Sequence, residues 1–252
     1  DSVNDRLFVA DYMNSRVLTM DFNKGTFVNG QNFDIVLGRA DFVTGGACGA
    51  VSATSLCNPS GLNYNSTTED LFVVDSNYNR VLIFDASVLN LSNTDSAVNV
   101  LGQSDFTSSS DYGGMTMSSG KGFSFPSNVE FDETSNLAFI SDADSRIYVF
   151  DISTIVDFET AVNILGQSSF SSLECESIIS SGITCNVSGM AFSESNNVLY
   201  VNDGLRSRIL GFDTATISDG EAANQLIGQA SYTVGFGNYF ENPHSAGMEQ
   251  PY

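Results

Sequence analysis

The chain has 252 residues, 42% of them hydrophobic, which is long and apolar enough for one large globular domain and argues against disorder. Its 30 acidic and 9 basic side chains give a formal net charge of −21, which repels phosphate backbones and anionic lipid. Nucleic-acid binding and membrane-surface binding are therefore not expected. No stretch approaches the roughly 18 consecutive apolar residues of a membrane span, so none is predicted.

One stretch of sequence occurs four times, at residues 7–21, 71–85, 137–151 and 199–213. Each copy begins with an aliphatic run that ends near an aspartate, and a polar turn then leads to an arginine that opens a second apolar run. The aspartates are Asp11, Asp75, Asp142 and Asp203, and the arginines are Arg16, Arg80, Arg146 and Arg208. In the third copy Ser141 holds the aligned position and Asp142 follows it, so we expect this copy to be displaced by one residue.

Two further markers recur in phase with these copies. After each copy comes a Leu-Gly-Gln-like element, with glycines at Gly38, Gly102, Gly166 and Gly228. An aromatic residue follows each element, at Phe42, Phe106, Phe170 and Tyr232. A Pro-Ser-Gly-apolar element or a variant of it opens three repeats, at residues 59–62, 126–129 and 187–190. A fixed period of this kind indicates one small structural unit that is copied along the chain.

The second repeat is predicted to contain four short strands, at residues 61–65, 71–74, 80–84 and 98–101. Their β-branched and aromatic residues, bounded by Asn, Asp, Ser and Gly, are typical of strands and turns. Four antiparallel strands per repeat, arranged about an axis, predict an all-β fold, a β-propeller. A solenoid is the competing fold, but its repeats usually hold one strand in 20 to 45 residues.

We expect one propeller domain over residues 1–252, with blades at residues 1–42, 59–106, 126–170 and 187–232. The first blade begins directly at a second strand, so the prediction is three full blades and one partial blade. Residues 233–252 are interpreted as a loop entering a further blade. The chain is therefore expected to be a segment of a longer protein whose ring has about six blades. A four-bladed ring closed by the chain ends is the alternative.

The repeat resembles the NHL-repeat family of β-propellers. The matching residues are Pro59 to Leu62, Leu71 to Asp75, Asn79 to Val81, and Phe84 with Asp85. The other copies depart from the pattern because Ser15, Ser145 and Ser207 replace the asparagine. The Leu-Gly-Gln-x-x-aromatic element is similar to a long-repeat, secreted subgroup of that family. The resemblance implies a propeller that serves mostly as a binding platform, since only a minority of such propellers are enzymes.

Four cysteines form two local pairs, Cys48 with Cys57 and Cys175 with Cys185. Each pair lies in an inter-blade loop, which predicts two loop disulfides and places the chain outside the cytosol, as an extracellular or cell-surface protein. Zinc binding is the alternative, although zinc sites favour cysteines two to four residues apart. Three N-glycosylation sequons begin at Asn65, Asn90 and Asn186 and make a glycoprotein the expected form if the source glycosylates them.

The four repeat aspartates, Asp11, Asp75, Asp142 and Asp203, allow two interpretations. They are weak candidates for a ring of carboxylates near a propeller axis that would hold Ca²⁺. Alternatively, each aspartate accepts hydrogen bonds from its own turn and pairs with the arginine that follows it. The recurrence of arginine with aspartate in every copy favours the structural pairs. No other cofactor is expected.

Catalytic groups are scarce in this sequence. His244 is the only histidine, so a multi-histidine zinc site of the kind used by amidating-lyase relatives is not expected. No Gly-rich phosphate loop occurs. The first hypothesis is a non-enzymatic propeller that binds other proteins or glycans through its loop faces. The second is a structural subunit that forms an extracellular filament, sheath or appendage as a homo-oligomer or polymer. The third is a Ca²⁺-dependent hydrolase or lyase.

Overall fold

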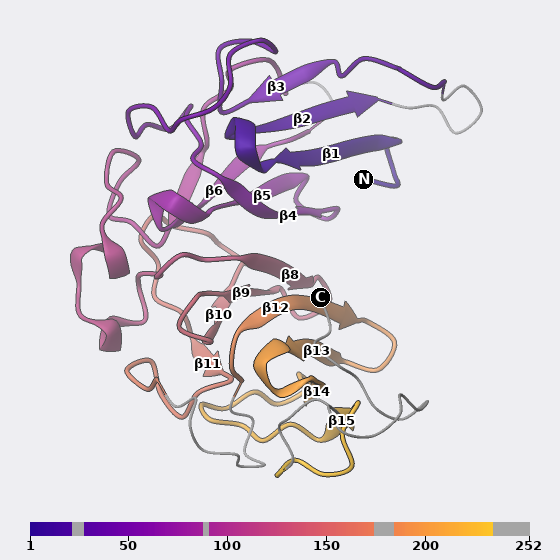
Figure 1. The fold of residues 1–252 in the computed structure, drawn as a ribbon, viewed down its shortest axis with the longest axis vertical. Coiled ribbons are helices and arrows are strands. Elements are labelled where there is room, and N and C mark those ends of the chain that lie inside the picture. Colours follow the sequence, from indigo (N-terminus) through magenta and orange to yellow (C-terminus); the bar gives the residue numbers. More distant parts are fainter. Residues whose placement is uncertain (22–27, 88–90, 174–183, 234–252) are drawn as a thin grey trace. The chain divides into compact units, whose positions relative to one another are not determined.

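The structure of the chain, a computed structural model, describes residues 1–21, 28–87, 91–173 and 184–233. Within these residues the regular structure consists of β-strands and short 3₁₀ turns, so the predicted all-β class is confirmed. The strands form four antiparallel sheets, and each sheet is built from strands that follow one another in the chain (Figure 1). The sheets lie within the four predicted blade ranges, one sheet to each range.

The first sheet has three strands: β1 (Arg6–Asp11), β2 (Arg16–Asp21) and β3 (Ile35–Leu37). The second has four strands: β4 (Pro59–Asn65), β5 (Asp70–Asp75), β6 (Arg80–Asp85) and β7 (Asn99–Leu101). The third has four strands: β8 (Asn128–Asp132), β9 (Leu137–Ser141), β10 (Ile147–Asp151) and β11 (Asn163–Leu165). The fourth has four strands: β12 (Val187–Ser193), β13 (Val198–Asp203), β14 (Arg208–Asp213) and β15 (Gln225–Ile227).

Short 3₁₀ turns connect some of these elements: η1 (Tyr12–Asn14), η2 (Ser76–Tyr78), η3 (Asp111–Gly114), η4 (Met117–Ser119) and η5 (Gly204–Arg206). Three of them, η1, η2 and η5, occupy the same place in their repeats, between the second and third strands. Each ends at a residue in the left-handed region, with φ between 51° and 54°. The turn therefore reverses the chain within a few residues and places the repeat aspartate opposite the repeat arginine in the ladder.

The third repeat keeps its strand register and has a shorter turn. Ile147 pairs with Ser141 in the same way that Val81 pairs with Val74, so Asp142 occupies the place of Asp75. The prediction that Ser141 holds the aligned position is therefore wrong. The third repeat is instead one residue shorter in the turn between Asp142 and Arg146. A slip of one residue in the strand would have moved every side chain to the other face, whereas a shorter turn leaves the faces unchanged.

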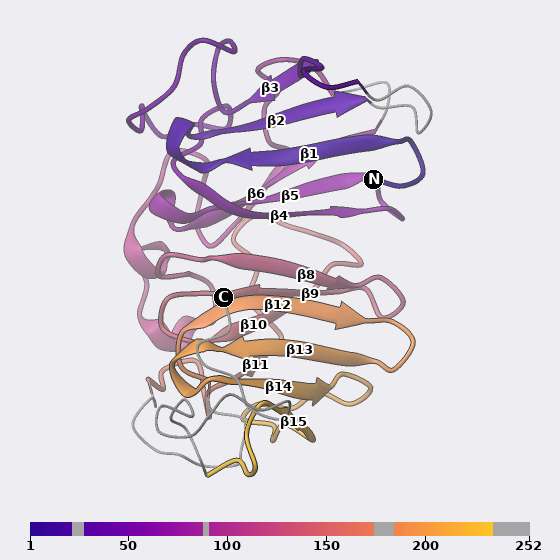
Figure 2. The ribbon, with the colours of Figure 1, turned by 45° about the vertical axis from the view of Figure 1, so that its right-hand side comes forward.

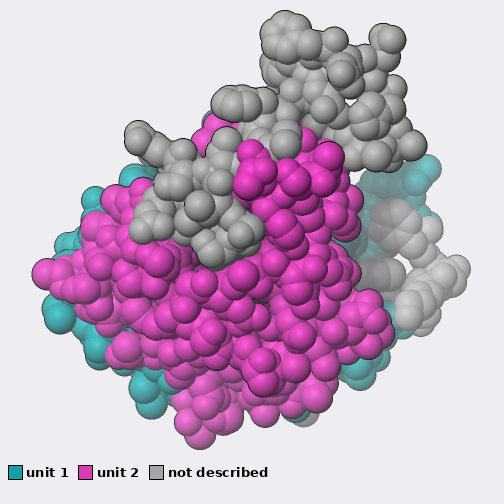
Figure 3. Space-filling view, turned by 90° about the horizontal axis from the view of Figure 1, so that it is seen from below, with its two compact units in different colours: residues 1–115, 121–129, 155–159 teal, residues 116–120, 130–154, 160–252 magenta. Residues whose placement is uncertain are grey.

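The chain divides into two compact units (Figure 3). Unit 1 comprises residues 1–115, 121–129 and 155–159 and contains the first two sheets. Unit 2 comprises residues 116–120, 130–154 and 160–252 and contains the fourth sheet and most of the third. Each unit has a core in which side chains from its two sheets pack together. Within unit 1, Figures 1 and 2 both show β1 lying beside β4.

The two cores are built in the same way. In unit 1 the first sheet contributes Phe8, Val17 and Leu37 and the second contributes Leu71, Val73 and Leu82. In unit 2 the third sheet contributes Phe139, Ile147 and Leu165 and the fourth contributes Leu199, Val201 and Leu210. The ring pair Phe8–Tyr64 in unit 1, with centroids 5.7 Å apart, corresponds to Phe139–Phe192 in unit 2 at 5.9 Å. In both units, therefore, the earlier sheet uses one face and the later sheet uses the opposite face.

Candidate functional site

The second repeat shows most completely how the recurring pair of Asp and Arg is used. Arg80 Nε donates to Asp75 Oδ2 at 2.8 Å, and both side chains are completely buried. Asp75 Oδ1 accepts the backbone N–H of Cys57 at 2.6 Å. Further Arg80 nitrogens donate to the carbonyls of Phe106, at 2.7 Å, and Ser55, at 2.8 Å. One guanidinium group thus ties the hairpin to the loops before and after its sheet.

The same ion pair occurs in the other repeats, which brings together the residues that the sequence pairs. Arg16 Nε donates to Asp11 Oδ2, and Arg208 Nε donates to Asp203 Oδ2, both at 2.7 Å. In the third repeat the shorter turn changes the geometry, because Arg146 contacts Asp142 through Nη2 and also reaches Asp144 Oδ2 at 2.8 Å. The first pair is more open than the others: the Arg16 side chain is 15% exposed and that of Asp11 is 24% exposed.

A second function of these arginines explains the aromatic marker. In every repeat the arginine Nη1 donates to the backbone carbonyl of the aromatic residue that follows the Leu-Gly-Gln-like element. The acceptors are the carbonyls of Phe42, Phe106, Phe170 and Tyr232. Sequence reasoning missed this contact because a carbonyl acceptor leaves no mark on residue type. The similar spacing between arginine and aromatic residue, 26 residues in the first two repeats and 24 in the last two, was the available signal.

The Gly-Gln element also holds the connection that follows each sheet. Gly102 has φ +88°, and a Cβ atom placed there would clash with the Phe123 ring. Gln103 then donates through Nε2 to the carbonyls of Asn79, at 2.9 Å, and Ser110, at 2.7 Å. In the first repeat Arg39 replaces the glutamine. It donates to the carbonyl of Asn14, the last residue of η1, at 3.2 Å.

The residue before each repeat arginine links its sheet to the next connection. Its side chain accepts the backbone N–H of a residue in that connection in three repeats. The pairs are Ser15 with Asn58 at 3.3 Å, Asn79 with Phe125 at 2.8 Å, and Ser145 with Asn186 at 2.8 Å. Serine and asparagine both offer a side-chain oxygen to this N–H, which explains why serine can replace the asparagine of the NHL-like pattern.

The outermost strands of three sheets are capped by side chains from the following repeat. Each cap is an Asn or Asp oxygen that accepts a backbone N–H of the strand. The pairs are Val36 with Asn93 at 2.8 Å, Val100 with Asp157 at 3.0 Å, and Ile164 with Asp219 at 3.0 Å. The same strand residues accept a backbone N–H in return from Thr94, Phe158 and Gly220. These caps protect sheet edges that would otherwise invite pairing with other chains.

Burial raises the pKa values of the aspartates in three of the Asp–Arg ion pairs. Desolvation raises the pKa of Asp75 to about 6, against the opposing effect of the Arg80 charge and the Cys57 N–H. Desolvation also raises the pKa of Asp142 and that of Asp203, opposed by Arg146 and Arg208. These carboxylates are removed from solvent and held by donors, so they are unsuited to act as nucleophiles or as bases on an external substrate.

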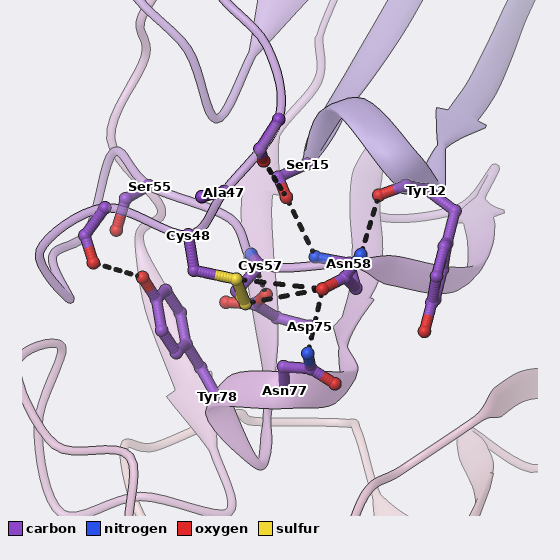
Figure 4. Close-up of a disulfide and its surroundings, with 12 residues drawn as sticks. Tyr12, Ser15, Ala47, Cys48, Ser55, Cys57, Asn58, Asp75, Asn77 and Tyr78 are labelled. Atoms are coloured by element: carbon purple, nitrogen blue, oxygen red, sulfur yellow. Dashed lines mark hydrogen bonds between the residues drawn. A yellow bond between two sulfur atoms is a disulfide. The ribbon is translucent and has the colours of Figure 1, made fainter.

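The predicted disulfide between Cys48 and Cys57 is present, with the Cα atoms 4.9 Å apart (Figure 4). It lies next to the ion-pair network, because Cys57 donates to Asp75. The neighbouring Tyr78 hydroxyl donates to the carbonyl of Gly49 at 2.6 Å, inside the loop that the disulfide closes. Cys185 is also disulfide-bonded, and Cys175, its predicted partner, lies outside the described residues.

The metal hypothesis finds no support in the placement of the repeat aspartates. Within residues 1–21, 28–87, 91–173 and 184–233, no group of three His, Cys, Asp or Glu side chains could hold a metal ion. Asp75, Asp142 and Asp203 are each buried against the arginine of their own repeat. His244 lies outside the described residues.

The three sequons differ in their surroundings. Asn65 is 2% exposed, and its Oδ1 accepts the backbone N–H groups of Thr67 and Thr68, so the folded chain offers no room for a glycan there. Asn186 is exposed. Asn90 lies outside the described residues. Of the described sequons, Asn186 is therefore the accessible one.

Comparison with known proteins adds no identification. No protein-family model matches the chain, and no curated protein matches its sequence. Within the described part of the chain, no helix has the length and apolar character needed to cross a bilayer.

Proposed function

We propose that this chain forms part of an extracellular, non-enzymatic β-propeller that binds other proteins or glycans through its loops. The observation that carries the proposal is the repeated packing of sheets in both units. In each unit the earlier sheet uses one face and the later sheet uses the opposite face, and a series of sheets packed in this way about an axis forms a ring. The Asp–Arg junctions favour the same architecture because they repeat with the sheets.

The loop disulfide supports an extracellular location, since such bonds persist in oxidising compartments and are rare in the cytosol. Asp75, Asp142 and Asp203 are buried, which supports a structural role for the aspartates that recur in the repeats. Binding is then assigned to connections, which is where propellers and other rigid scaffolds carry recognition.

The turn end of the first sheet offers a candidate binding surface. Three apolar side chains are exposed there: Tyr12 at 45%, Met13 at 75% and Val43 at 92%. Asn14 lies against Gly45, so the η1 turn and the loop that carries Val43 are neighbours. Apolar and aromatic side chains gathered on a loop surface are typical of protein-contact sites.

The proposal is tested by electron microscopy and by a binding screen against extracellular proteins and glycans. Class averages should show a ring of blades, and Met13→Asp or Val43→Asp should weaken any protein interaction at least about tenfold. Val28→Asp is the matched control, because Val28 is 60% exposed but lies in the β2–β3 connection. Filaments of purified protein would instead support the structural-subunit hypothesis. Activity abolished by chelation would support the hydrolase hypothesis.

A further inference from the structure

We propose that Asn29 is a site of spontaneous covalent modification, where the side-chain amide is lost and aspartate and isoaspartate accumulate as the protein ages. Asn29 precedes Gly30 in the connection between β2 and β3. The site is separate from the loop surface proposed above, because it is defined by the reactivity of one turn and not by binding.

The reaction requires only the chain and water. The backbone nitrogen of Gly30 loses its proton and attacks the Cγ atom of Asn29, a C–N bond forms, and the Asn29 amide nitrogen leaves as ammonia. The resulting five-membered succinimide takes up one water, which breaks one of the two bonds between the ring nitrogen and its carbonyl carbons. Breaking the bond to Cγ gives aspartate, and breaking the bond to the main-chain carbon gives isoaspartate. Glycine favours the attack because no Cβ atom obstructs a close approach of its backbone.

The structure leaves both reacting groups accessible. Asn29 and Gly30 are exposed, and the preceding Val28 is 60% exposed. Gly30 has φ +80°, and a Cβ atom placed there would have no neighbour within 4 Å. The turn is closed by the Gln31 N–H, which donates to the Val28 carbonyl at 3.2 Å. Among the described residues, neither the Gly30 N–H nor the Asn29 side chain has a hydrogen-bond partner, so both can reorient for the attack.

Two comparable steps show how the fold can prevent this chemistry. At Asp203–Gly204 and Asp219–Gly220 the same succinimide would form with loss of water instead of ammonia. In both steps the glycine N–H donates to a backbone carbonyl, and the aspartate accepts a backbone N–H. The bonds run from Gly204 to Asn186 at 3.1 Å, from Gly220 to Ile164 at 3.4 Å, from Cys185 to Asp203 at 2.8 Å and from Ile164 to Asp219 at 3.0 Å. The nitrogen and the carboxyl carbon can therefore meet only after these bonds have broken.

Modification at Asn29 changes both the charge and the backbone beside the end of β2. Either product adds one negative charge to a chain that already carries −21. Isoaspartate also lengthens the main chain of the turn by one carbon atom. Gln31 Nε2 donates to the carbonyl of Asp21, the last residue of β2, at 3.1 Å, so this is the contact that the longer turn displaces first.

Peptide mapping of the oxidised full chain during incubation at pH 7 and pH 8 tests the proposal. The peptide that contains Asn29 should gain the mass expected when NH₂ is replaced by OH, and it should do so before any other described asparagine. It should appear in two chromatographic forms, and the reaction should be faster at pH 8, because the attacking nitrogen must lose its proton. Asn29→Asp supplies the reference for the aspartate form. Asn29→Gln is the matched control and should yield neither product, since its longer side chain cannot close a five-membered ring.

A comparison of folded and unfolded chains tests the structural part of the proposal. Unfolding in concentrated guanidinium chloride should accelerate isomerisation at Asp203 and Asp219 at least about tenfold, because the hydrogen bonds that hold them are lost. The rate at Asn29 should agree within about threefold between the two states, since exposed turns open at little cost. Absence of both products at Asn29, earlier reaction at another described asparagine, or strong slowing at Asn29 by folding would overturn the proposal.

Discussion

Arg80 and Asp75 are buried together, and this makes them more sensitive to change than an ordinary surface pair. Removing one partner of a buried ion pair leaves the other charge unpaired out of water, which typically costs 3 to 5 kcal/mol. The Arg80 side chain also serves three backbone carbonyls, those of Phe106, Ser52 and Ser55. The loss of this one residue therefore affects the hairpin and two connections.

We expect Arg80→Met to lower the free energy of unfolding by about 3 kcal/mol or more, because Asp75 loses its counter-charge in a buried site. Arg16→Met is the matched control, since its ion pair with Asp11 is partly exposed, and it should cost about 1 kcal/mol or less. Denaturant unfolding of the oxidised protein measures both values. Equal losses in the two variants would show that burial does not set the importance of the junction.

The raised carboxyl pKa values predict an unusual dependence of stability on pH. Asp75 has a pKa of about 6 in the folded chain and 3.8 ordinarily, so the folded state keeps its proton to higher pH than the unfolded state. Its contribution to stability is therefore greatest below pH 3.8 and is lost as the pH rises through about 6. Asp142 and Asp203 are shifted in the same direction. The melting temperature should rise by about 5 °C between pH 7 and pH 4.5.

Two variants separate this effect from the general reduction of charge at low pH. Asp75→Asn should reduce the rise in melting temperature, because it removes the carboxyl that takes up a proton. Asp105→Asn should leave the rise unchanged, since hydrogen bonds from Thr107 and Ser108 hold the Asp105 pKa at about 2, below the pH range measured. A melting temperature that falls steadily on acidification would contradict the proposed direction of the shifts.

At the scale of the structural element, the glycine of the Leu-Gly-Gln-like element has little room for a side chain in the first three repeats, at Gly38, Gly102 and Gly166. Gly102→Ala should cost about 3 kcal/mol, since the methyl group meets the Phe123 ring and the residue has φ +88°. Gly46→Ala, at φ +92° with open space around the site, should cost about 1 kcal/mol. The difference isolates the packing contribution, and chemical denaturation measures it.

A double-mutant cycle with Phe123→Leu tests the assigned cause. In that background the additional cost of Gly102→Ala should fall toward the value for Gly46→Ala, because the smaller side chain can move away from the new methyl group. An unchanged cost would mean that backbone conformation, and not contact with Phe123, limits the position.

The strands were predictable because apolar runs bounded by polar turns encode them locally. Residues 71–74 and 80–84 were expected to be strands and lie inside β5 and β6. The ion pairs were also predictable, because Asp and Arg recur together. The register of the third repeat was not, since Asp142 is aligned by hydrogen bonding to β10 and not by its distance from neighbouring markers. A contact between strands can override simple spacing.

The edge caps illustrate a different limit of sequence reasoning. Asn93, Asp157 and Asp219 perform the same function from irregular connections, although one is an asparagine, two are aspartates, and their sequence neighbours differ. Asn and Asp are common in turns for local reasons, so a capping residue cannot be distinguished from an ordinary turn residue before the fold is known. The aromatic carbonyls that accept from the arginines are hidden for a related reason, because every residue type has a carbonyl.

At the scale of the whole molecule, charge is the dominant feature. The chain carries 30 acidic against 9 basic residues, and Arg80, Arg146 and Arg208 are buried in the junctions. The surface is therefore left with even fewer cations to balance its carboxylates. Self-repulsion of this kind destabilises a compact state, and salt reduces it.

We expect the melting temperature at pH 7 to rise by about 3 °C or more between 0.01 and 0.15 M sodium chloride, as the screening length falls from about 30 to about 8 Å. At pH 4.5, where more carboxyls are neutral, the same change in salt should have a smaller effect. Calorimetry at both pH values provides the comparison. A decrease with salt at pH 7 would indicate that attractive surface pairs outweigh the repulsion.

The side-chain caps on the outer strands also impose an order on biosynthesis. The N–H of Val36 can be capped only after Asn93, 57 residues further along the chain, has been synthesised. The N–H of Val100 depends in the same way on Asp157, also 57 residues later. At 5 to 20 residues per second, a ribosome needs about 3 to 11 s to make that stretch. The edge of the outermost strand in each newly synthesised sheet therefore remains uncapped for seconds. The speed of translation sets how long a nascent chain can mispair with neighbouring chains.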